Sequence, residues 1–132
     1  MASQEFIQQV DGYGEPGEEP RSFDPIAEVD AFVRAMKAIV LHGFARAQYC
    51  HGTDAIEMPN PEWFVDSQTS TAQENYYAVL LHELTHWSGA STRLNRSFGK
   101  RFGYEADSFE ELVAELGAAG MCAGFGISND PR

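Results

Sequence analysis

The stretch AQENYYAVLLHELTHWS, residues 72–88, predicts a helix. Thr71 and Glu74 have the spacing of a capping box at its start, and Gly89 is a typical stop. Large apolar side chains recur along it at helical spacing: Tyr77, Leu80, Leu81, Leu84 and Trp87. We therefore expect this helix to lie at the centre of the core.

The same helix carries His82-Glu83-Leu84-Thr85-His86, which is the pattern HExxH. Residues four apart lie on one helix face, so both imidazoles can reach a single metal ion. Glu83 lies beside them, where its carboxylate can take a proton from a water molecule as a general base. The alternative is that both histidines are ordinary helix residues paired with Glu83 or with the backbone.

A catalytic zinc ion has three protein ligands, and the third is sought in SFEELVAELGAA, residues 108–119. Glu111 and Glu115 share a helix face, whereas Glu110 lies about 100° away. We predict Glu111 as the third ligand and Glu115 as the acceptor of an imidazole N–H, with Glu115 and then Glu110 as the alternative ligands. Ser108 and Glu111 also fit a capping box. Apolar residues bracket the glutamate face and favour its turning inward: Phe109, Leu112, Val113 and Leu116.

The remaining histidines and the cysteines form no second metal-binding pattern. His42 and His51 lack ligand spacing to any other candidate and are interpreted as surface or capping residues. Cys50 and Cys122 are far apart and in no CxxC pair, so we expect reduced, buried thiols.

Upstream of the HExxH helix, the sequence predicts an arm, a helix and a hairpin. Residues 1–23 are rich in Gly, Pro and Glu and are interpreted as a linker or N-terminal arm, with a single domain over residues 24–132. Asp24 as the N-cap and Pro25 predict a helix that ends at Leu41.

Two short strands are then expected, at residues 45–50 and 54–59. A last helix is predicted from Tyr104 or Ser108 to Ala123. The order helix, strand, strand, helix, helix indicates a compact α+β domain.

The charge balance excludes some function classes. Twenty acidic and nine basic residues among 132 give a formal charge of -11, which repels nucleic acid phosphates. We expect no DNA binding from this chain alone. No apolar run approaches the roughly 20 residues that cross a bilayer, and the first residues lack the pattern of a signal peptide. These features favour a cytoplasmic protein without a membrane partner.

The segments NYYAVLLHELTHWSGASTRLNR, residues 75–96, and FGYEADSFEELVAELGAAGMCAGFGI, residues 102–127, resemble the C-terminal metallopeptidase domain of ArdC-type antirestriction proteins. Proteins of this type are carried by conjugative plasmids and phages. EFIQQVDGY, residues 5–13, and AQYCHGTDAIEMP, residues 47–59, look like the family's linker and its strand pair. The resemblance thus extends over nearly the whole chain and implies a zincin-like fold.

The resemblance implies roles for several residues. His82 and His86 take the places of the histidine ligands, Glu83 that of the catalytic base, and the EELVAE segment that of the acidic ligand helix. It further implies core packing for Tyr76 and Tyr77 and structural anchoring for Arg93 and Arg96.

This chain departs from the family pattern in two respects. Members commonly show an HWTGH-like stretch, where this chain has Ser88 and Ala90, so a contribution from that later histidine is absent. The family's N-terminal domain, associated with single-stranded DNA binding, does not occur in this sequence.

These observations predict a zinc-dependent metallopeptidase of the gluzincin type in an antirestriction protein of a mobile element. Its substrate is expected to be a protein or peptide, such as a protein of a restriction system, and the strand at 55–58 is expected to be an edge that pairs with it. The rival is a non-catalytic acidic protein that inhibits restriction enzymes as a DNA mimic. A toxin-like protease and a metal other than zinc, such as manganese or cobalt, remain open.

Overall fold

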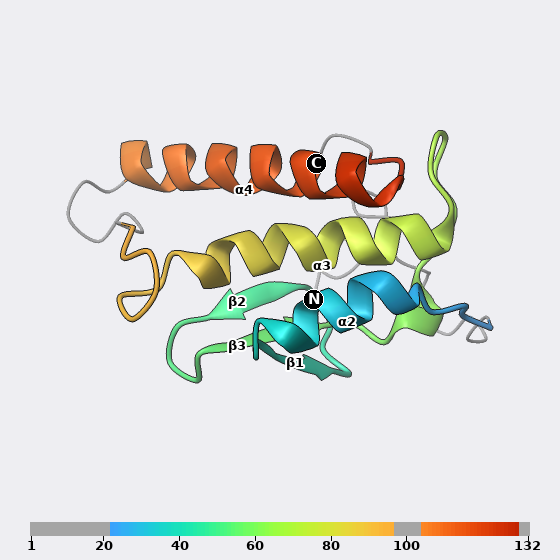
Figure 1. Cartoon of the computed structure of the whole chain (residues 1–132), viewed down its shortest axis with the longest axis horizontal. Helices are drawn as coiled ribbons and strands as arrows, with labels where there is room; N and C mark the ends of the chain where they lie inside the picture. Colours follow the sequence, from blue (N-terminus) through green and yellow to red (C-terminus); the bar gives the residue numbers. More distant parts are fainter. Residues whose placement is uncertain (1–21, 97–103, 130–132) are drawn as a thin grey trace.

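The computed structural model describes residues 22–96 and 104–129. The elements in these ranges are α2 (Ala27–Ala35), β1 (Ile39–His42), β2 (Gln48–Cys50), β3 (Ala55–Met58), η1 (Pro61–Trp63), α3 (Ala72–Ser88) and α4 (Tyr104–Phe125). Figure 1 shows α3 in the middle layer, with α4 on one side and the sheet and α2 on the other. The predicted α+β fold is confirmed. None of the described helices is long and apolar enough to span a membrane.

α3 is the predicted HExxH helix, with the predicted bounds. Both hydrogen bonds of its capping box are present: Thr71 Oγ1 accepts from the backbone N–H of Glu74 at 3.1 Å, and the Glu74 carboxylate accepts from that of Thr71 at 3.0 Å. Nearly every side chain from Asn75 to Trp87 is buried, because the helix is covered on two sides. α3 therefore holds its histidines in a rigid central position.

The sheet has the strand order β1-β3-β2. β2 and β3 form the predicted antiparallel hairpin, in which Tyr49 faces Ile56. The prediction that the strand at Ala55–Met58 is an edge is wrong, because β3 pairs with strands on both sides and is the central one. The outer strands are β1 and β2.

The first helix is shorter than predicted. It ends at Ala35 rather than at Leu41, and Lys37 adopts a left-handed conformation with φ 63° that ends the helical path. Ile39–His42 then forms β1, which pairs in parallel with β3. As strand residues, Ile39 and Val40 lie in the hydrogen-bonded ladder with β3. Both are β-branched, and β-branched residues favour strands over helices.

The start of α2 also differs from the prediction. Its N-cap is Ile26, not Asp24, and the Ile26 side chain makes no capping hydrogen bond. The backbone N–H of Ile26 instead donates to the Tyr77 hydroxyl at 2.9 Å, and that hydroxyl donates to Asp30 at 2.9 Å. A side chain of α3 thus fixes the entry into α2.

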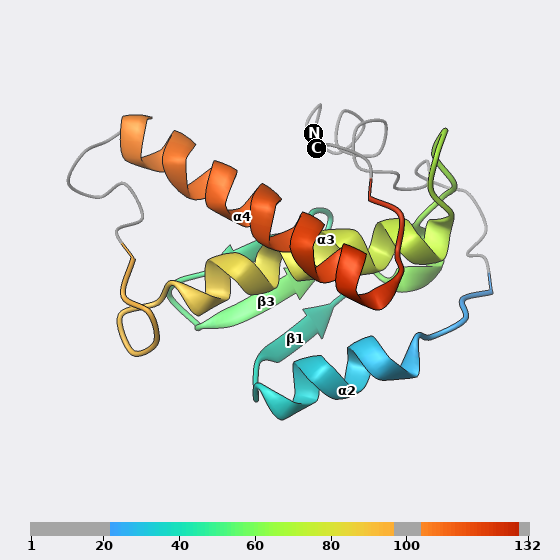
Figure 2. The ribbon, with the colours of Figure 1, turned by 45° about the horizontal axis from the view of Figure 1, so that its top comes forward.

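α4 runs back along α3, as Figure 2 shows. The face of α4 that is turned toward α3 consists mainly of small residues. The buried positions on this face are Glu110, Ala114, Ala118 and Cys122. Because α4 begins at Tyr104, Ser108 lies inside the helix, and the alternative that Ser108 and Glu111 form a capping box is excluded.

The apolar neighbours of the glutamates do not turn inward as a group. Phe109, Leu112 and Leu116 are 64%, 54% and 65% exposed and Val113 is half-buried, although the glutamate face that they bracket is turned toward α3. The reason is the close approach of α4 to α3, which only small residues permit.

Candidate metal centre

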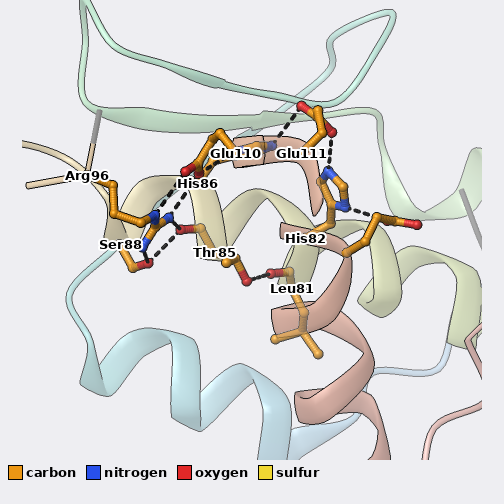
Figure 3. Close-up of polar contacts among 9 residues, drawn as sticks. Leu81, His82, Thr85, His86, Ser88, Arg96, Glu110 and Glu111 are labelled. Atoms are coloured by element: carbon orange, nitrogen blue, oxygen red, sulfur yellow. Dashed lines mark hydrogen bonds and ion pairs between the residues drawn. The ribbon is translucent and has the colours of Figure 1, made fainter. Parts of the chain in front are cut away.

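The two histidines of HExxH lie side by side on α3. Their rings are 5.0 Å apart between centroids, and the side chains of His82 and His86 are only 11% and 12% exposed. The helical spacing of four residues brings them together, as Figure 3 shows. Both rings present their Nε2 atoms to the same residue of α4.

That residue is Glu111. One carboxylate oxygen lies 3.1 Å from Nε2 of His82, and the other lies 3.1 Å from Nε2 of His86. One ligand atom from each of the three residues falls within 4.8 Å of the others. The Glu111 side chain is 63% exposed, so this group of atoms opens to solvent.

The opposite nitrogen of each ring contacts a different glutamate. Nδ1 of His82 lies 2.8 Å from Glu115, and Nδ1 of His86 lies 2.9 Å from Glu110. An ionised carboxylate only accepts hydrogen bonds, so each Nδ1 is the donor. Each Nε2 contacts Glu111 and is the nitrogen that could bind a metal ion once it has lost its proton.

Sequence reasoning ranked Glu110 last among the ligand candidates, and the structure places it behind His86, away from Glu111. Arg96 donates to both of its oxygens, from Nε and from Nη2, at 2.9 Å each. One signal in the sequence could have indicated that this carboxylate is buried. Glu110 shares a helix face with Ala114, Gly117 and Ala118, and a face of small residues is typical of close packing against another helix.

Glu83 lies outside the group of converging ligand atoms. It is 9% exposed, and burial raises the pKa of its carboxyl, although the charges of His82 and His86 and a hydrogen bond from the backbone of Tyr49 act against this. A carboxyl with a raised pKa next to two imidazoles is suited to accept and release a proton.

The charges of the site act strongly on the histidines. Burial lowers the pKa of His86, but its hydrogen bonds to Glu111 and Glu110 outweigh burial and raise this pKa to about 9. The pKa of His82 is also raised, because Glu111 and Glu83 outweigh burial. The hydrogen bonds from both histidines lower the pKa of Glu111.

The other residues singled out in the sequence lie outside this cluster. His42 is 2.6 Å from the hydroxyl of Tyr76, and the ring of His51 packs against that of Tyr49. Tyr76 and Tyr77 are buried in the core. Cys50 and Cys122 form no disulfide with each other, and Cys122 is buried as expected, whereas Cys50 is half-buried. Arg93 lies over the Trp87 ring.

The donor set fits a divalent transition metal. Two imidazole nitrogens and one carboxylate oxygen are the ligands of many catalytic zinc sites, and each imidazole has the carboxylate partner on its far nitrogen that such ligands normally have. Residues 82–115 supply all of these side chains.

The chain belongs to the zincin-like metallopeptidase family, whose model matches residues 27–132. It is 38% identical over 126 residues to the uncharacterized protein y4eC of Sinorhizobium fredii, and 33% identical over 125 residues to DNA primase TraC of Escherichia coli. Each match covers 94% of this chain, but only 39% of y4eC and 11% of TraC.

Two solved structures of the antirestriction protein ArdC from plasmid R388 are similar to this one. The metal-free structure has a TM-score of 0.65 at 34% identity, covering 86% of this chain and 38% of that one. The Mn(II)-bound structure has a TM-score of 0.62 at 36% identity, covering 80% and 38%. The resemblance to ArdC is confirmed, and this chain spans about two fifths of that protein.

Proposed function

We propose that this domain is a zinc-dependent peptidase in which His82, His86 and Glu111 hold the ion and Glu83 is the general base. The observation that carries the proposal is the convergence of three ligand atoms within 4.8 Å, with each Nδ1 engaged by a separate carboxylate. A zinc ion held there would lower the pKa of a water molecule and polarise a substrate carbonyl.

The protein groups then have separate tasks. Glu83, next to the first histidine along α3, takes a proton from the attacking water and passes it to the leaving amine. Its raised pKa suits both transfers, and the hydrogen bond from the Tyr49 backbone helps to fix its orientation. Glu115 and Glu110 keep the imidazole rings in the tautomer that binds metal.

The metal is proposed to be zinc because two imidazoles and one carboxylate suit this ion. Manganese is the competing candidate, since the similar ArdC protein has a Mn(II)-bound structure. Elemental analysis of the purified protein, with His82→Ala as the comparison, distinguishes the two ions.

The proposed substrate is a protein of a restriction system, cleaved in the cytoplasm of a cell that receives a mobile element. Similarity to the antirestriction protein ArdC supports this choice. The test incubates purified restriction enzyme subunits with the wild-type protein or with Glu83→Gln and detects fragments by mass spectrometry.

Glu83→Gln is expected to keep its fold and its metal and to cleave about 10²–10⁴ times more slowly, because only the proton acceptor is lost. Glu28→Gln is the matched control, since Glu28 is exposed on α2, and it should cleave at the wild-type rate. Equal cleavage by the wild type and Glu83→Gln would remove Glu83 from its proposed role.

The net charge of -11 favours one second candidate, an acidic DNA mimic that occupies restriction enzymes without catalysis. On that account Glu83→Gln protects DNA from restriction as well as the wild type does, and no fragments form. Protection assays on both proteins therefore separate the two functions.

A further inference from the structure

The carboxylate of Glu110 is buried between α3 and α4 and accepts hydrogen bonds at both of its oxygens. Its side chain is 5% exposed, and each of its oxygens accepts a hydrogen bond from Arg96 at 2.9 Å. One oxygen also accepts from Nδ1 of His86 at 2.9 Å. Because both oxygens are engaged, this carboxylate cannot rotate without breaking several hydrogen bonds at once.

Arg96 is itself fixed to the end of α3. Its Nη1 donates to Ser88 Oγ at 3.1 Å, its Nη2 donates to the carbonyl of Thr85 at 2.6 Å, and its backbone N–H donates to Gly89. The guanidinium therefore connects the last turn of α3 with Glu110 of α4 (Figure 3).

We propose that Arg96 is a positioning residue of the metal centre, which sets the orientation of the His86 ring through Glu110. The inference rests on the function proposed above, because it assigns a task in metal binding. Ser88, one of the departures from the family pattern, belongs to this arrangement, because its hydroxyl accepts a hydrogen bond from Arg96.

The planar fork of the guanidinium is what this task requires. It meets both oxygens of Glu110 at once and so fixes the plane of the carboxylate that receives the Nδ1–H of His86. Nε2 of His86 is then directed at Glu111. Without the fork, a buried carboxylate has to find other partners, and the ring of His86 loses its fixed acceptor.

The two imidazoles are thus oriented by different means. Glu115, the acceptor for His82, is 31% exposed, whereas Glu110 is almost fully buried and bound to a cation. Removing Arg96 should therefore affect one ligand and leave the other in place.

The experiment compares Arg96→Gln with Arg93→Gln in the full chain. Arg93 is a matched control, because it lies three residues earlier, donates to the Trp87 carbonyl at the same helix end, and pairs with Asp54 rather than with the site. Dissociation constants for Zn²⁺ and Co²⁺ are measured by competition with a chromophoric chelator. The visible spectrum of bound Co²⁺ reports the geometry of its ligands.

Arg96→Gln is expected to bind both ions about 10–100 times more weakly and to change the Co²⁺ spectrum, while Arg93→Gln matches the wild type in both. In a Glu110→Gln background, Arg96→Gln should cause no further loss, because Arg96 acts through that carboxylate. A full additional loss in the double variant would overturn the inference.

Unchanged affinity in a folded Arg96→Gln would also overturn it, although the proposed function would stand. If circular dichroism shows that Arg96→Gln does not fold, Arg96→Lys replaces it, because lysine keeps the charge but lacks the fork. Binding weakened about tenfold then supports the inference, and wild-type binding contradicts it. A wild-type protein that binds neither ion overturns the proposed function itself.

Discussion

Glu110, Glu111 and Glu115 lie within two turns of one helix, yet each has a different surrounding. Glu111 contacts both Nε2 atoms and is 63% exposed, Glu115 contacts Nδ1 of His82, and Glu110 is buried against Arg96 and His86. The direction of each side chain from α4, rather than its chemical type, separates the proposed metal ligand from the two residues that are proposed to orient the imidazole rings.

This separation makes the effects of two substitutions unequal. Glu111→Ala removes a ligand and should weaken Zn²⁺ binding by more than about 100-fold, whereas Glu115→Gln should weaken it by about 10–100-fold, because the metal keeps its three ligands. Chelator competition on both variants measures the difference. A larger loss in Glu115→Gln than in Glu111→Ala would show that the two roles are exchanged.

Spacing along a helix predicts much of this site, because it determines which side chains share a face. The pairs His82 with His86 and Glu111 with Glu115 follow from separations of four residues. The contact between Arg96 and Glu110 could not be predicted in this way. It depends on the path of the chain between two helices, which local pattern does not determine.

At the scale of elements, the distance between α3 and α4 depends on one glycine. A Cβ added at Gly117 would lie 2.7 Å from Oγ1 and 2.8 Å from Cγ2 of Thr85, which is too close for any real contact. Thr85 belongs to the HExxH turn and donates to the carbonyl of Leu81 at 3.0 Å. Gly117 therefore allows α4 to bring its glutamates within reach of the histidines.

Gly117→Ala should lower the free energy of unfolding by about 1–3 kcal/mol, since the added methyl group forces the helices apart. Gly120→Ala is the matched control on the same helix, because a Cβ there meets nothing within 4 Å. It should be neutral or raise stability by up to about 1 kcal/mol, through better helix propensity. Urea denaturation followed by circular dichroism measures both variants.

The Thr85→Ala/Gly117→Ala double variant tests the cause. It should recover part of the stability that Gly117→Ala loses, because the side-chain atoms in conflict are gone. No recovery would show that the loss arises from something other than this contact.

At the scale of the whole molecule, the central helix and the hairpin were predictable, but the parallel strand β1 was not. Caps and apolar periodicity mark α3 locally, and a tight turn marks the hairpin. In the sequence, β1 resembles a continuation of α2, because Ile39 keeps the helical spacing of Phe32 and Met36. In the structure, Lys37 ends the helical path before β1 begins. Its pairing with β3 is a long-range contact, which no local window contains.

β1 also makes the stability of the whole chain depend on pH through His42. Burial lowers the pKa of this histidine below its ordinary 6.5, against the charges of Glu62 and Asp30. The unfolded chain then binds the proton more readily than the folded one. The stability due to the neutral ring is present above pH 6.5 and is lost as the pH falls through the lower, folded pKa.

The free energy of unfolding of the wild type should therefore fall more steeply than that of His42→Gln between about pH 7 and pH 5, where the unfolded histidine gains its proton. Urea denaturation of both proteins at several pH values, with chelator present throughout, measures the difference. Parallel pH profiles would show that His42 contributes no such dependence. The acidic groups common to both proteins cancel in the comparison.

Among the described residues, the side chains of the proposed metal centre come from α3, α4 and Arg96, and the sheet contributes a backbone hydrogen bond to Glu83. The proposed ion ligands and the proposed general base Glu83 therefore come from the same pair of helices, and the sheet helps only to orient the base. A recombination breakpoint just before Thr71 would move the ion-holding pair of helices whole into a new protein. Glu83 would travel with the pair, but the fixed orientation of its carboxylate would depend on the strand that its new neighbour offers.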